Sequence, residues 1–196
     1  AKGIVEKHVA LQGGARDGGR CRGLWWAELS DINMGLALAR LIFNNDDRSE
    51  DSTISELLRE ALDLCESAGA QDKMATILNS LGTLKQKQKC MLDAEKYYTK
   101  SLELRRRMGS SQTAHRDRAQ SYTSLGNLFV DMGDAAAKRA ADGEGGEGGS
   151  GGGASAPASA EASATATEFY ATALSHLQQA KEAYEIGFQP QHPKVA

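Results

Sequence analysis

The sequence is poor in the residues that end helices, cross-link a fold or span a membrane. Its 196 residues include three prolines and three cysteines, and no apolar run approaches eighteen residues. The lack of such a run excludes a membrane-spanning helix. The cysteines (Cys21, Cys65 and Cys90) are odd in number, lie far apart and form no CxxC pair. We therefore expect reduced thiols in a cytoplasmic protein.

Strong charge bias and strand patterns are also absent. The formal net charge is −3, which is too small to indicate a nucleic-acid-binding chain or an acidic tail. Sustained alternation of apolar and polar residues is missing, and proline stands only at Pro157, Pro190 and Pro193. With forty per cent hydrophobic residues to form a core, the chain is predicted to be all-α.

The apolar spacing indicates a series of helices. We predict Leu24–Phe43, Thr53–Ala68, Lys73–Lys87, Leu92–Met108, His115–Met132 and Glu168–Ile186, with a weaker helix over Ile4–Leu11. Thr53 with Glu56, and Thr165 with Glu168, have the spacing of a capping box. In that motif the two side chains bind loose backbone donors of the first turn, so both threonines are predicted helix starts.

Composition changes abruptly once along the chain. From Ala135 to about Thr165 there is almost no large apolar residue, and such a segment cannot offset its ordering entropy by burial, so we expect disorder there. The chain lacks an initiating Met, and we interpret it as a fragment of a longer protein. The organisation we expect is a poorly ordered or weakly helical segment 1–23, helical repeats 24–133, a low-complexity Gly/Ala/Ser-rich insertion 134–165, and a second repeat helix with its following loop 166–196.

One sequence element occurs twice. The stretch "LNSLGTL" at Leu78–Leu84 returns as "YTSLGNL" at Tyr122–Leu128, 44 residues later. After the first copy, Ala94, Tyr98 and Ser101 stand at spacings of four and three, which places them on one helical face. The same spacing recurs at Ala173, Leu177 and Ala180, and less closely at Ile54, Leu58 and Ala61. Each unit is therefore predicted to be a helix pair that crosses closely, since Gly and Ala let two backbones approach.

The second unit contains extra residues. A repeat of 44 residues would place the equivalent of Ala94 at position 138, but the matching residue is Ala173, 35 residues further on. The additional residues follow Gly133, in the predicted turn, where an insertion adds only loop-closure entropy.

These pieces resemble tetratricopeptide repeats of the long type found in kinesin light chains and nephrocystin-type proteins. The resemblance depends on "ILNSLGTL" with the following "DAEKYYTKSLELR", on "SYTSLGNLFVDMGD", and on the terminal "QPQHPKVA". In the last piece Gln189 and Gln191 replace the family's usual Gly and Asp. The resemblance implies a right-handed α-solenoid that serves as a protein-interaction scaffold or adaptor, with association with the cytoskeleton or the cilium.

In such a solenoid the first helix of each pair lines a concave groove that binds partner peptides. The polar residues beside the Leu-Gly step are the candidates for peptide binding: Asn79, Thr83, Gln86 and Lys87 in one helix, and Gln120, Thr123 and Asn127 in the next. An asparagine amide suits this role because it offers a donor and an acceptor to a partner's main chain. The alternative for each residue is plain solvation of an amphipathic helix.

Charge indicates the kind of partner. Lys85 to Arg118 contains ten basic and four acidic residues, a net of plus six, which would steer an acidic peptide toward this region. The alternative is that these residues only keep an outer helix face soluble. A second function class is a helical repeat protein that binds single-stranded RNA, although the overall acidity disfavours it.

No constellation for catalysis is visible. The four histidines are scattered, and none pairs with Cys, Ser or carboxylates at the spacing of a metal site or a nucleophile. We expect no enzyme activity, no cofactor and no metal ion.

Overall fold

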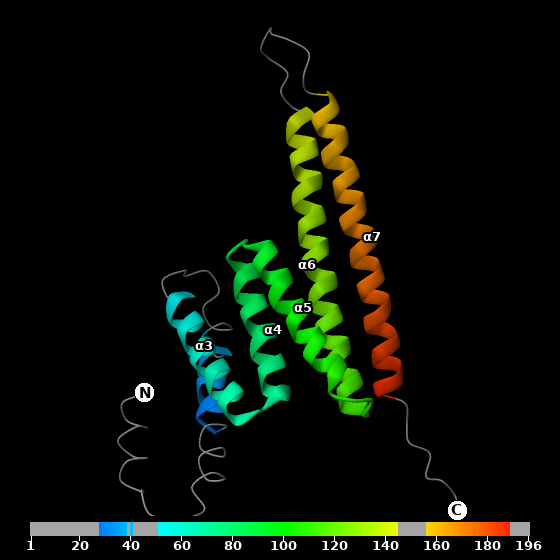
Figure 1. The fold of residues 1–196 in the computed structure, drawn as a ribbon. Coiled ribbons are helices and arrows are strands. Elements are labelled where there is room, and N and C mark those ends of the chain that lie inside the picture. The colour runs from blue at the N-terminus through cyan, green and yellow to red at the C-terminus, as the bar shows by residue number, and fades with distance from the viewer. Residues whose placement is uncertain (1–27, 39, 41–50, 145–155, 189–196) are drawn as a thin grey trace, which may run out of the picture. The chain divides into compact units, whose positions relative to one another are not determined.

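The computed structural model describes residues 28–38, 40, 51–144 and 156–188, and within these ranges it contains helices and short turns without strands (Figure 1). The all-α prediction is confirmed for this part of the chain. Predictions for 1–23, including the weak helix Ile4–Leu11, and for the loop "QPQHPKVA" concern residues outside it. The chain forms two compact units, which divide between Ile77 and Leu78.

The helix bounds follow the predicted ones closely in the middle of the chain. Residues 28–38 are helical, and the later helices are α3 (Asp51–Ala68), α4 (Gln71–Lys87), α5 (Met91–Arg107), α6 (Gln112–Glu144) and α7 (Ala156–Gly187). Both predicted capping boxes are wrong. Thr53 lies inside α3, and Thr165 lies inside α7, where its hydroxyl donates to the Glu161 carbonyl. A cap that we did not predict is Ser111, whose Oγ accepts a hydrogen bond from the Ala114 amide at 3.1 Å at the start of α6.

The first unit packs α3 against the helix of residues 28–38. The predicted stripe on α3 is buried, with Ile54, Leu58 and Ala61 all inaccessible. The Ser30 hydroxyl is also buried; it donates to the Ala61 carbonyl at 3.1 Å and lies 2.9 Å from Cys65 Sγ. These polar contacts fix the register of the two packed helices, because sliding one helix by one residue would leave the Ser30 hydroxyl without its hydrogen-bond partners.

The second unit begins within α4, at Leu78, and contains the rest of that helix with α5, followed by α6 with α7. A Cβ added to Gly82 would lie 2.5 Å from the Tyr98 ring, and a Cβ added to Gly126 would lie 2.7 Å from Leu177. Ala94 and Ala173, which precede these large residues by one turn, are buried. The prediction that each of these two units is a helix pair that crosses closely is confirmed at Gly82 and Gly126.

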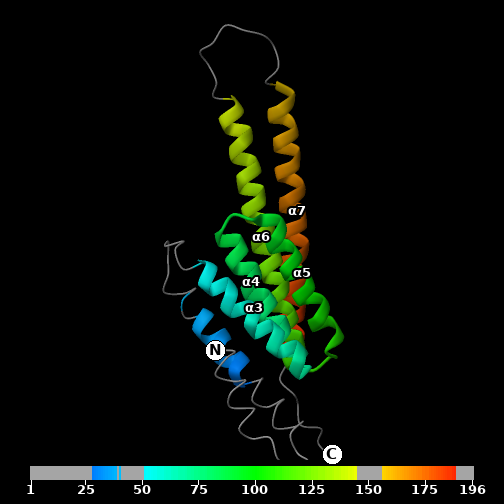
Figure 2. The same ribbon diagram turned by 60° about the vertical axis from the view of Figure 1, so that its left-hand side comes forward.

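The second hairpin is longer than the sequence suggested. Helices α6 and α7 lie side by side and continue past α5 (Figures 1 and 2). The prediction of disorder over the whole of Ala135–Thr165 is wrong, because α6 runs to Glu144 and α7 begins at Ala156; residues 145–155 are outside the described part. The physical reason is that alanine has the highest helix propensity and permits close packing.

Buried contacts within this extension support that explanation. Ala136 on α6 and Ala166 on α7 are both buried. At the start of the extension, a Cβ added to Gly133 would lie 2.6 Å from the Tyr170 ring. The Tyr170 hydroxyl also donates a hydrogen bond to Asp134 at 2.7 Å. Residues 134–144 and 156–165 of the low-complexity segment therefore belong to the two helices of this hairpin.

Alanine substitution of the two repeat glycines tests the close helix crossing. Glycine-to-alanine changes inside a helix normally stabilise it by about 0.5–1 kcal/mol. We expect Gly82→Ala and Gly126→Ala instead to lower the free energy of unfolding by about 1–3 kcal/mol, because the new methyl group overpacks the contact. Gly35→Ala is the control, since a Cβ there meets nothing within 4 Å. Urea unfolding followed by circular dichroism would measure all three, and stabilisation at all three positions would contradict the close crossing.

Candidate functional site

The first helices of the two hairpins, α4 and α6, are joined by a hydrogen bond. Gln86 Nε2 donates to Asp131 Oδ2 at 2.7 Å. The two residues are 45 positions apart, close to the repeat of 44. Candidate residues on α4 therefore have their counterparts on the neighbouring helix α6, and the two rows form one face, which we call the α4–α6 face.

Two of the candidates on α4 use their polar groups internally. The Tyr98 hydroxyl of α5 lies 2.8 Å from Gln86 Oε1 and 3.1 Å from Thr83 Oγ1, and the Thr83 hydroxyl itself donates to the Asn79 carbonyl. Burial raises the pKa of Tyr98, so the hydroxyl keeps its proton and donates it. The chain from Tyr98 through Gln86 to Asp131 thus connects three helices, and Thr83 and Gln86 help to hold the α4–α6 face together.

Other candidates present groups that a partner could reach. The Asn79 side chain is partly buried and its Oδ1 has no hydrogen-bond partner within the described residues. Asn127, Gln120 and Lys87 are exposed. Thr123 is partly buried and its hydroxyl donates to the carbonyl four residues earlier, that of Ala119, which is an ordinary arrangement within a helix.

Asp131 was missed by the sequence reasoning. Its signal was its position, since it follows Asn127 by one helical turn and therefore continues the same row. It is partly buried and holds the Gln86 amide through one carboxylate oxygen. The face therefore combines neutral amides with one carboxylate, a set suited to hydrogen bonding with a peptide main chain.

A buried arginine joins α5 to α6. Arg105 is 3% exposed, and its Nη1 donates to the Asp117 carbonyl at 2.6 Å and to Ser121 Oγ at 2.8 Å. Burial lowers the pKa of Arg105, while the nearby Asp117 carboxylate opposes that change. Arg105 was counted among the basic residues that steer a partner, but its head group is enclosed and contributes little to the surface.

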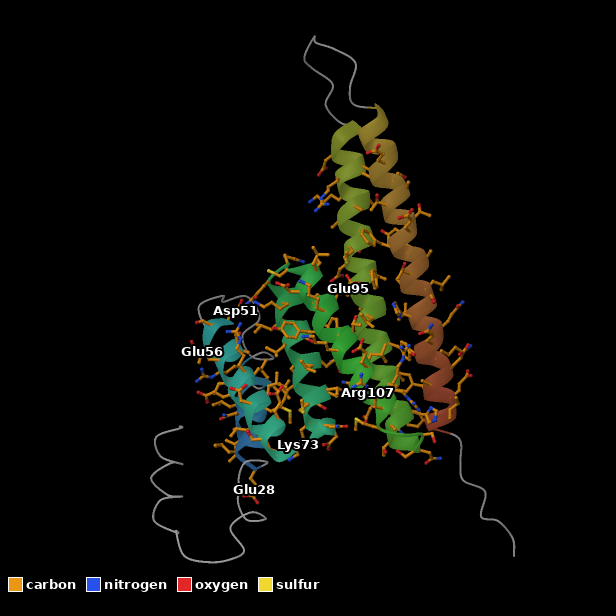
Figure 3. All side chains as sticks on the ribbon, in the orientation of Figure 1. Glu28, Asp51, Glu56, Lys73, Glu95 and Arg107 are labelled. Carbon is orange, nitrogen blue, oxygen red and sulfur yellow. The ribbon has the colours of Figure 1, made fainter. Side chains whose placement is uncertain are left out.

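The exposed basic residues lie elsewhere on the same helices. Lys100 and Arg107 are exposed on α5, where Figure 3 labels Arg107, and Lys89 is exposed in the turn before it. Other cations have local partners: Lys96 pairs with Asp93 at 3.2 Å, and Arg106 donates to the Tyr122 hydroxyl at 2.8 Å. Part of the predicted positive region is thus available to a partner.

An aromatic cluster surrounds His176 on α7. The imidazole stacks on Phe129 with ring centroids 5.6 Å apart and lies 6.2 Å from Tyr122. Its Nδ1 is buried and has no hydrogen-bond partner within the described ranges. Burial lowers the pKa of His176, the Arg106 cation lowers it further, and Glu95 of α5, labelled in Figure 3, opposes both.

In the described part of the chain, no three His, Cys, Asp or Glu side chains come together as a metal ion would require. None of the described helices has the length and apolarity needed to cross a membrane. Comparison of the chain with protein-family models, curated proteins and solved structures found no match. The resemblance to tetratricopeptide repeats therefore depends on the quoted motifs alone.

The buried imidazole predicts a dependence of stability on pH. Because the pKa of His176 is lowered by folding from its ordinary value of 6.5, the unfolded chain takes up more protons as the pH falls through 6.5, and the folded state loses stability. We expect His176→Phe, which keeps an aromatic ring but cannot titrate, to lose less free energy of unfolding than the wild type between about pH 7.5 and 5.5. Parallel losses in urea unfolding at both pH values would contradict this.

Proposed function

We propose that the chain is part of a protein-interaction scaffold that binds a peptide segment of a partner on the α4–α6 face. The observation that supports this most directly is the Gln86–Asp131 hydrogen bond, because it joins the two repeated first helices, each of which carries a row of candidate residues. A face of amides on a rigid helical scaffold can bind an extended chain through its main-chain groups.

The architecture that accompanies this proposal is a right-handed solenoid of tetratricopeptide type. Two hairpins with equivalent glycine contacts are its building blocks, and stacking them in one sense produces a curved array whose first helices line the inner side. The long-repeat type, an adaptor role resembling that of kinesin light chains, and a cytoplasmic location with a cytoskeletal or ciliary association belong to the same proposal.

The partner segment is proposed to be acidic. Lys89, Lys100 and Arg107 remain exposed, and exposed cations raise the association rate of an acidic partner by attraction at a distance. This contribution should decrease as salt screens it, over about 10 Å at 0.1 M ionic strength. The amides Asn79 and Asn127 would supply the short-range contacts.

A double substitution tests the proposed face. Asn79→Ala with Asn127→Ala removes both amides. We expect stability to change little, because Asn79 Oδ1 has no hydrogen-bond partner among the described residues and Asn127 is exposed. Partners captured from cell extract and quantified by mass spectrometry should fall at least about tenfold relative to the wild type, the equivalent of 1.4 kcal/mol.

The matched control is Thr99→Ala with Glu103→Ala, two exposed residues on the second helix α5. Partners lost with the amide variant and retained with this control support the proposal, provided that both variants melt at the wild-type temperature. Equal retention by both variants would refute it. Tight binding of mixed single-stranded RNA at physiological salt would favour the RNA-binding alternative instead.

A further inference from the structure

Four aromatic rings stack in alternation from α7 and α6. The ring of Phe169 on α7 lies 6.2 Å from that of Phe129 on α6, and Phe129 lies 5.6 Å from His176 on α7. His176 in turn lies 6.2 Å from Tyr122 on α6. The Arg106 guanidinium of α5 lies 5.6 Å from the centre of the Tyr122 ring, at the end of the row. We call Phe169, Phe129, His176 and Tyr122 the aromatic ladder.

Apart from the ladder, α7 contributes few large side chains to its contact with α6. Among residues 161–187 the buried side chains are all alanines: Ala166, Ala173, Ala180 and Ala183. Two larger side chains pack on glycines of α6, Leu177 on Gly126 and Tyr170 on Gly133, whereas Leu174 is 58% exposed. A helix with few buried apolar contacts opens locally at a low free-energy cost. The ladder therefore supplies much of the packing that holds α7 on α6.

His176 lies in the middle of the ladder, in surroundings that disfavour its charged form. Both nitrogens of an imidazolium are donors, so protonation would leave the inaccessible Nδ1–H without an acceptor among the described residues. Arg106 of α5 repels the added charge, and Glu95 of α5 attracts it. Tyr122 of α6 is the other titratable ring of the ladder. The residues of α7 one turn from His176 are uncharged: Thr172, Ala173, Gln179 and Ala180.

We infer that the aromatic ladder is an acid-sensitive latch, in which protonation of His176 releases α7 from α6 while α5 keeps its contacts with α4 and α6. The added charge arises between Phe129 and Tyr122, so both stacking contacts of His176 are affected. The contacts of α5 are different in kind. Tyr98 packs on Gly82 of α4, and Leu102 is buried, and none of these residues titrates near pH 6.

The latch differs from a loss of stability of the whole chain, because it concerns which helix opens first. Unfolding of the whole second unit would expose the amides of α5 and α7 alike. Release of α7 alone would expose its own amides and the side of α6 that it covers. The latch does not depend on the proposed peptide-binding face, whose candidate residues lie on α4 and α6.

Hydrogen exchange of the full 196-residue chain, measured by mass spectrometry at about pH 7.5 and 5.5 and corrected for intrinsic exchange rates, tests the inference. Protection of amides in residues 170–183 should fall several-fold, up to about tenfold, the limit for a group whose ordinary pKa is 6.5. Protection in residues 94–105 of α5 should change by less than about twofold, because no group there is linked to the opening. His176→Phe should abolish the fall. His115→Phe, at a partly buried histidine of α6 outside the ladder, is the control and should retain it.

Two charge variants separate the titration of His176 from a general loss of packing. Titration of the His176 ring followed by NMR should shift to higher pH in Arg106→Gln, which removes the repelling cation, and to lower pH in Glu95→Gln, which removes the attracting anion labelled in Figure 3. The acid-induced fall in protection of α7 should shrink accordingly in Arg106→Gln.

Three outcomes would overturn the latch: protection of α7 that does not change with pH, a fall that persists in His176→Phe, or an equal fall in α5 and α7. The last outcome would show that acid unfolds the second unit as a whole, and the dependence of overall stability on His176 would then remain without a local opening.

Discussion

The close approach of each repeat glycine to a large side chain on the following helix determines the rest of the second unit. At Gly82 the Tyr98 ring occupies the space that a Cβ would need, and at Gly126 Leu177 does so. Because the Tyr98 ring passes so near the α4 backbone, its hydroxyl reaches Gln86, which in turn binds Asp131. One steric contact thus aligns α4, α5 and α6, and with them the candidate binding face.

The same contact explains why the second hairpin can be longer than the first. In α4 the helix ends at Lys87, and Lys89, with a φ of 62°, is in the turn. At the equivalent position 44 residues later stands Gly133, which packs on Tyr170 as Gly126 packs on Leu177. A further glycine contact therefore replaces the turn, and the two helices stay close enough for the alanines beyond it to pack.

The repeat, the helix order and the equivalent glycine contacts could be predicted from the sequence because they depend on spacing, which the helical period converts directly into faces. The helical structure of residues 134–144 and 156–165 could not be predicted, since a composition rich in Ala, Gly and Ser is equally suited to disorder and to a close-packed hairpin. The neighbouring contact between Gly133 and Tyr170 favours the hairpin. The internal roles of Thr83 and Gln86 were also hidden, because hydrogen bonds between helices depend on the side-chain reach of Tyr98. Arg105 gave no sequence signal that it was buried rather than exposed.

Positions 105 and 184 show how one repeat position serves two different purposes. In α5 the residue is an arginine whose charge is tolerated because α6 supplies a carbonyl and a hydroxyl to bind it. In α7 the equivalent residue is Tyr184, which has no second α6 beside it and remains partly exposed with Leu174 and Phe188. A polar network specifies one neighbour and one register, because a shift of one helix along the other would leave the buried guanidinium without its partners. The junction between α5 and α6 is therefore fixed by hydrogen bonds, whereas the Tyr184 ring lies against Phe188 of its own helix.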